Sequence, residues 1–126
     1  MDTVVMTDAL LRDVTAIEGF VAASVVDPLT GTVLADASTA GDASVQVTAS
    51  GAAELVHVLS VMTAQLATGA VVEDVIVTTT DRYHFVRVIE PAPGETALLV
   101  VMVDRARTRL AVALREVRDA GISRAH

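Results

Sequence analysis

The side chains that most often carry out chemistry in proteins are few in this sequence and lie far apart. It has no cysteine, which excludes a thiol nucleophile, a disulfide framework and a thiolate metal site. Its three histidines, His57, His84 and His126, show no metal-ligand spacing. Asp8 and Asp13 fall on different faces of a predicted helix, and no serine lies in a nucleophile elbow. We therefore expect a protein that is not an enzyme and that carries no cofactor and no metal.

The glycines do not form a phosphate-binding loop. Gly31, Gly41 and Gly51 are isolated, whereas a nucleotide-binding loop places several glycines in one strand-to-helix turn. We interpret each of the three as a turn or helix-end residue. The chain is therefore not expected to be a GTPase itself.

Composition favours one soluble domain. The length of 126 residues suits a single domain over 1–126, with a core of about 7–120 and flexible tails at 1–6 and 121–126. The formal net charge of −7 argues against nucleic acid and anionic membrane surfaces as partners. The longest apolar run, Ala97–Val103, falls short of the ~20 residues needed to cross a bilayer. No secretory pattern is present at the N-terminus, so we expect a cytoplasmic protein without membrane insertion.

Apolar periodicity and turn signals predict three helices and five strands. The first helix begins at 8, with Thr7 as its cap, and ends at Gly19, and strands over 20–27 and 32–36 follow it. The middle helix begins between 44 and 50 and ends near 68. Strands over 73–79, 83–90 and 96–103 come next, and the last helix covers 105–120 with Asp104 as its cap. Short turns join most of the strands, which predicts an α+β domain with an antiparallel sheet.

The apolar patterns also predict where each strand lies in the sheet. The strands 20–27 and 96–103 are apolar on both faces, so we expect them in the centre with helices on both sides. The short strand 32–36 ends in a charge and suits one edge. The strand Glu73–Thr79 suits the other edge, and its β-branched middle has neither a proline nor an inward charge. Such an edge is unguarded against pairing with another chain.

The middle helix has two faces, of which we expect the one with Leu55, Leu59, Met62 and Leu66 to pack on the sheet. The opposite face is small and polar with little charge, which favours a protein contact over the alternative of an alanine-rich solvent face. The predicted interface comprises Ala53, His57, Ser60, Val61, Ala64, Gln65 and Thr68 of this helix and its end, together with Val75, Val77 and Thr79 of the edge strand.

The last helix carries the largest group of basic residues. They spread around its outer arc with acidic residues among them, which favours a solvated face over the docking of an acidic partner. The group is Arg105, Arg107, Arg109, Arg115 and Arg118. The side chains expected to face inward from this helix are Ala106, Leu110, Ala113, Leu114 and Val117.

Four segments follow one another in an order that is distinctive as a whole, although none is distinctive alone. They are Ile17–Val21, Val25–Leu34, Glu73–Val77 and Tyr83–Val88. With the long small-residue helix, the apolar last strand and the amphipathic last helix, they resemble the roadblock (dynein light chain) domain family over about residues 7–120. The resemblance implies a profilin-like fold with a five-stranded antiparallel sheet in the order 2-1-5-4-3. The long second helix is expected on one face of that sheet, and the first and third helices on the other.

The resemblance also implies a function. Roadblock domains form homodimers or heterodimers in which the third strands pair edge to edge and the second helices pack together. Bacterial members bind small Ras-like GTPases and regulate their nucleotide cycle. We therefore expect a homodimeric regulator with a small Ras-like GTPase as partner. The alternative is a scaffold or a small-molecule sensor without a GTPase partner, and a sensor needs a cavity with convergent polar groups.

Overall fold

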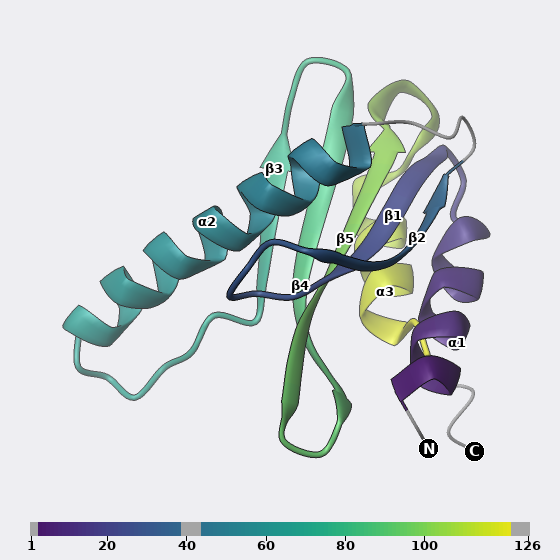
Figure 1. Ribbon diagram of the computed structural model, residues 1–126. Coiled ribbons are helices and arrows are strands. Elements are labelled where there is room, and N and C mark those ends of the chain that lie inside the picture. The colour runs from purple at the N-terminus through teal and green to yellow at the C-terminus, as the bar shows by residue number, and fades with distance from the viewer. Residues whose placement is uncertain (1–2, 39–43, 122–126) are drawn as a thin grey trace.

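The computed structural model describes residues 3–38 and 44–121 (Figure 1). Its elements follow the predicted order, with one short 3-10 helix, η1, in addition. They are α1 Thr3–Thr15, β1 Phe20–Val26, β2 Val33–Ser38, α2 Ser44–Gln65, β3 Asp74–Thr78, β4 Arg82–Ala92, β5 Glu95–Asp104, η1 Arg105–Arg107 and α3 Leu110–Asp119. The start of α2 at Ser44 is the earliest point of the predicted window. Gly41 and His126 lie outside the described residues.

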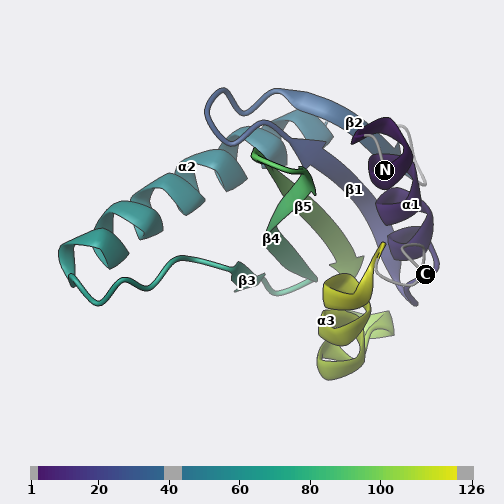
Figure 2. The ribbon, with the colours of Figure 1, turned by 90° about the horizontal axis from the view of Figure 1, so that it is seen from below.

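The five strands form one antiparallel sheet in the order β2-β1-β5-β4-β3, which confirms the predicted fold class. The helix α2 lies on one face of this sheet, and α1 and α3 lie on the other (Figures 1 and 2). The central positions of β1 and β5 follow from their composition, because their residues are apolar on both alternating faces and both faces are buried. The strands β2 and β3 form the two edges, as predicted.

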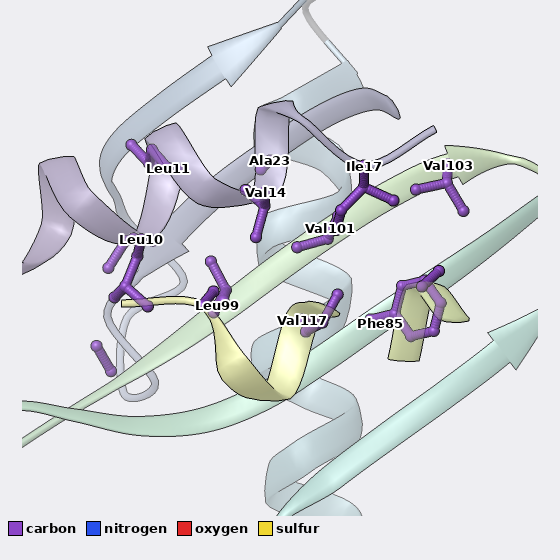
Figure 3. Close-up of a cluster of buried hydrophobic side chains, with 14 residues drawn as sticks. Leu10, Leu11, Val14, Ile17, Ala23, Phe85, Leu99, Val101, Val103 and Val117 are labelled. Atoms are coloured by element: carbon purple, nitrogen blue, oxygen red, sulfur yellow. The ribbon is translucent and has the colours of Figure 1, made fainter. Parts of the chain in front are cut away.

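Large side chains fill the layer between the sheet and the pair α1 and α3. Leu10 and Val14 of α1 meet Phe85 of β4, Leu99 of β5 and Val117 of α3 (Figure 3). Each of these side chains is almost completely buried. Full burial of such a side chain contributes about 1.5–3 kcal/mol relative to exposure. This layer therefore holds most of the large apolar side chains that are fully buried.

The layer under α2 is built from smaller side chains. The helix residues are Ala49, Ala52, Ala53 and Val56, and they pack against Val26, Val86, Leu98 and Val100 of the sheet. Small side chains let the backbone of α2 approach the sheet closely, and the β1–β2 turn also lies close to the helix. Gly31 in that turn has φ +74°, and a Cβ there would lie 3.3 Å from the Cα of Ser50. The Nε2 of Gln46 donates to the Gly31 carbonyl at 3.3 Å.

The first helix begins earlier than predicted. The helix α1 starts at Thr3, so Thr3–Met6 form part of it. Thr7 lies buried within the helix, and the prediction that it caps the N-terminus is wrong. The physical reason is Met6, which packs against the α1/α3 core and extends the apolar stripe of the helix by one turn.

The last helix begins later than predicted. Asp104 is a cap, because its Oδ1 accepts the Ala106 N–H at 3.0 Å, but it caps η1 and not α3. Thr108 then takes an extended conformation, in which its Oγ1 donates to the carbonyls of Glu18 at 2.9 Å and Asp104 at 2.7 Å. These bonds interrupt the helix. Ala106 and Leu110 are exposed as a result, contrary to the prediction that they face inward.

Candidate partner-binding surface

The edge strand β3 offers an open side to another chain. It pairs with β4, and among the described residues no strand lies beside its other edge. The pairing sets Val75 opposite Val86 and Val77 opposite His84. Ile76 and Val77 are 38% and 36% exposed. The edge therefore combines open backbone hydrogen-bonding groups with apolar side chains, as the sequence predicted.

The C-terminal part of α2 projects beyond the sheet on the same side as β3, and the chain then returns to that strand (Figure 2). We call residues 57–66 the α2 overhang. Its large apolar side chains have little cover, with Val58 62%, Val61 45%, Met62 50% and Leu66 65% exposed. Single exposed apolar residues are ordinary, but a group of four on one short segment indicates a contact surface.

The structure corrects which face of α2 packs on the sheet. Met62 and Leu66, predicted to pack there, are exposed, and Leu55 and Leu59 are only half-buried. Ala53, predicted as an interface residue, is 8% exposed and belongs to the protein's own core. The reason is geometric, because the alanines allow close approach to the sheet where leucines would hold the helix away.

The other predicted interface residues lie in two groups. His57, Ser60, Val61, Ala64 and Gln65 are exposed on the overhang, as predicted for that face. Thr68 is exposed in the loop after α2, because the helix ends at Gln65 and Ala67 has a positive φ of 55°.

Three predicted residues come from the edge strand and its turn. Val77 lies on the exposed edge, whereas Val75 is half-buried against the core beneath α2. Thr79 lies in the β3–β4 turn, where its Oγ1 accepts the Arg82 N–H at 3.0 Å. Its hydroxyl therefore holds the turn in shape, and its place in an interface stays a prediction.

Two grooves flank the overhang and connect it to the rest of the surface. One, of about 500 Å³, lies between the overhang and β3 and is lined by Leu59, Met62 and Val75. The other, of about 400 Å³, lies towards the β1–β2 turn and includes His57, Ser60 and Ala64. Val71 and Val72 of the loop line both grooves. Sequence reasoning missed these two residues, although a Val-Val pair in a loop was the signal that could have found them.

No family model and no curated protein matches the chain, but solved structures do. The gliding protein MglB of Thermus thermophilus has a TM-score of 0.74 at 19% identity, over 94% of this chain and 85% of that one. A Roadblock/LC7 domain of Streptomyces avermitilis has 0.71 at 20% identity, over 98% and 94%. An MglB with a tetrameric arrangement has 0.69 at 20% identity, over 96% and 83%. The chain has the roadblock fold.

In this roadblock fold, α2 is also long and apolar enough to cross a membrane by length and composition. Glu54 and His57 interrupt its apolar sequence, so the helix does not stand out as an uninterrupted apolar run. The residues of α2 up to Val56 are packed on the sheet by Val45, Ala49, Ala52, Ala53 and Val56. The helix is therefore part of the folded domain and not a membrane span.

His84 lies on β4, opposite Val77 of the open edge strand β3. By strand alternation it lies on the same face as Val86, the face that α2 covers in part. Burial lowers the pKa of His84 below its usual value, the positive charge of Arg82 lowers it further, and Asp81 opposes both. Within residues 3–38 and 44–121, no group of three or more acidic or histidine side chains is placed to hold a metal ion. The uncovered apolar side chains of the α2 overhang and of β3 suit this surface to contact with another protein.

Proposed function

We propose that this protein is a non-catalytic, cytoplasmic, homodimeric adaptor that binds a small Ras-like GTPase and modulates its nucleotide cycle. One observation carries the proposal, namely the uncovered apolar surface that joins the α2 overhang to the open β3 edge. The roadblock fold supports it, since the resemblance to that family implies the same mode of pairing and the same class of partner.

The first step is the pairing of two copies. The β3 edges of two chains join, so that their open N–H and C=O groups form hydrogen bonds across the dimer. The two overhangs then pack together and cover Val61 and Met62, which are about half exposed in the single chain. A stable interface of ordinary size buries about 800 Å² on each partner. A strand edge, an overhanging helix and the two grooves beside it offer a surface of that kind.

The second step is the binding of the GTPase to the dimer. An adaptor without catalytic groups changes a nucleotide cycle only through unequal affinity for the conformations of its partner. The dimer therefore holds the switch regions of the GTPase in one of their two states, and the rate of hydrolysis or of nucleotide release changes as a consequence.

A capture experiment with matched variants tests both steps. Wild-type protein should sediment as a dimer at micromolar concentration and should retain one small GTPase from a lysate of its own organism, with more retained in either GDP or a GTP analogue. Val77→Glu should give a monomer and lose the GTPase, because it places charge in the paired edge. Leu34→Glu is the control, since Leu34 is 57% exposed on the opposite edge strand β2. A wild-type monomer, or a dimer that retains no GTPase in either nucleotide, contradicts the proposal.

A specific observation also favours the second candidate function, small-molecule sensing. The structure contains a pocket with convergent arginines on the face of the sheet away from α2. Its chemistry is independent of the GTPase partner.

A further inference from the structure

A pocket of about 440 Å³ opens on the face of the sheet that carries α1 and α3. It lies between Met6 and Leu10 of α1, the outer half of β4, and the end of α3 from Arg118 to Gly121. Figure 3 shows Leu10 beside the chain that leaves α3. Pockets for small molecules span about 300–1,000 Å³, so this one suits a small ligand.

The pocket has an apolar wall and a basic side. Met6, Leu10, Ile89 and Pro91 form the wall, and each is buried or half-buried. The guanidinium groups of Arg87, on the β4 strand that forms the floor, and Arg118 form the basic side. Apolar surface next to guanidinium hydrogen-bond donors is complementary to a molecule that has an anionic head and an apolar tail.

The two arginines differ in how fully their donors are used. The Nε and Nη2 of Arg118 both donate to Oδ2 of Asp74, at 3.1 and 2.8 Å. The side chain of Arg87 makes no hydrogen bond to any described residue, and its Nη1 lies 3.9 Å from Oδ1 of Asp74. A guanidinium has five N–H donors, and Arg87 is only 30% exposed. It is therefore a partly desolvated cation with donors available to a ligand.

Two carboxylates lie beside this site and offset the charge of the arginines. Asp74 does not line the pocket, but its carboxylate, with 11% of the side chain exposed, pairs with Arg118 at 2.8 Å and with Arg87 at 3.9 Å. Glu90 does line it, but its Oε1 accepts the Gly94 N–H at 2.9 Å in the β4–β5 turn. The carboxylate of Asp74 therefore fixes Arg118 at the pocket, and Glu90 keeps its negative charge at the turn. Recognition of an anion here rests on the hydrogen-bond donors of Arg87 that no described residue uses, and not on an excess of positive charge.

We propose that this pocket binds a short- to medium-chain carboxylate. The two carboxylate oxygens accept hydrogen bonds from the planar guanidinium of Arg87, and the Arg118 donors that Asp74 leaves unused add to them. The apolar tail lies against Met6, Leu10 and Ile89. The pocket and α2 are on opposite faces of the sheet, so dimerisation through the α2 overhang and β3 leaves it open. The proposal consequently does not depend on the GTPase partner.

Titration of the wild-type protein tests the ligand chemistry. The probes are butanoate, hexanoate and octanoate, each beside the primary alcohol of equal length, with binding followed by calorimetry and by the shifts of the Met6 and Ile89 methyl resonances. Affinity should rise with chain length among the carboxylates, and each alcohol should bind at least about tenfold more weakly. Alcohols that bind as tightly as the carboxylates, or the absence of any shift at millimolar probe, overturn the proposal.

Two arginine variants test the position of the site. Arg87→Gln should weaken octanoate binding by about tenfold or more, and Glu90→Gln should leave it equal or tighter. Arg115→Gln is the matched control, since it removes the same charge from an exposed position of α3 outside the pocket. Equal losses in Arg87→Gln and Arg115→Gln would overturn the proposal, because they would reflect overall charge alone. Thermal unfolding checks each variant, and if Arg87→Gln does not fold, the comparison of carboxylates with alcohols decides.

Discussion

The two parts of α2 are both apolar, but their surroundings are opposite. Up to Val56 the helix lies on the sheet, and Ala49 there is completely buried. From residue 57 onwards the helix overhangs the sheet, and Val58 and Met62 are 62% and 50% exposed. The buried part uses alanine and valine, whereas the overhang carries the larger methionine and leucine side chains. One helix therefore serves two surfaces, with its small residues inside the fold and its large ones outside.

The buried part of α2 therefore stabilises the single chain, whereas the α2 overhang is left uncovered for a partner. Burial on the sheet already contributes to the stability of the single chain, at about 25 cal/mol for each Å² of apolar surface removed from water. The same contribution from the overhang arises only when something covers it. Substitutions in the first part should therefore change unfolding, and substitutions in the overhang should change association.

The largest effect is expected from a charge in the buried part. Ala49→Asp places a carboxylate without a partner between α2 and the sheet, where an uncompensated charge costs about 3–5 kcal/mol. The free energy of unfolding of a small domain is about 5–15 kcal/mol. Urea unfolding should therefore show a large loss of stability, or the variant should not fold at all. Ala64→Asp is the matched control at an exposed position of the same helix. Measured on the monomer, it should lower the unfolding free energy by no more than about 1 kcal/mol, because aspartate forms a helix less readily than alanine. Equal losses in both would abolish the distinction between the two parts.

A charge in the overhang should act on association instead. Val61→Glu should weaken the dimer by about 2 kcal/mol or more, which is roughly a 30-fold increase in the dissociation constant, because it removes an apolar contact and desolvates a carboxylate. Sedimentation over a concentration series measures this change, and monomer unfolding should stay the same. The Leu34→Glu control on β2 should leave the dimer intact. A Val61→Glu dimer as tight as wild type would mean that the partner covers another surface.

Most of the fold could be predicted, because each strand of this sheet has a composition that matches its position. Val100 and its neighbours in β5 are apolar on both faces, and only the centre of a sheet buries both. The face of α2 could not be predicted in the same way. Hydrophobicity favours the leucines for the core, but close packing favours Ala49 and Ala53, and only the distance between helix and sheet decides between them. The starts of α1 and α3 were also missed, since they depend on contacts of Met6 and Thr108 with residues distant in the sequence.

The pocket beside Arg87 could not be predicted for a similar reason. Arg87 and Arg118 belong to elements that are far apart in the sequence, and Asp74 on a third element brings them together. Read along the chain, Arg118 is one of several arginines on a solvated helix. The site exists only once the sheet register sets Arg87 opposite Asp74.

The smallest effect is expected from a change of pH on the free energy of unfolding. It tests how fully His84 is buried on the face of the sheet that α2 covers in part. The pKa of His84 is lowered in the folded chain, mainly by burial, so the folded state binds fewer protons than the unfolded state. The contribution of His84 to stability is therefore complete above the unfolded pKa of about 6.5, and it is lost as the pH falls from there to the lowered folded value. Urea unfolding between pH 7.5 and 5.5 should show this loss, and His84→Gln should reduce it.

Dimerisation should enlarge this effect, because His84 lies opposite Val77 at the edge where the second chain is proposed to pair. Further burial lowers the pKa of the histidine again, so the dimer excludes the proton more strongly than the monomer does. The dimer dissociation constant should therefore increase as the pH falls below about 6.5, and the His84→Gln variant should lose most of that dependence. A dissociation constant that stays the same from pH 8 to 5.5 would show that the second chain does not bury His84 further. The proposed contact would then have to lie further along the α2 overhang, away from the β3–β4 pair.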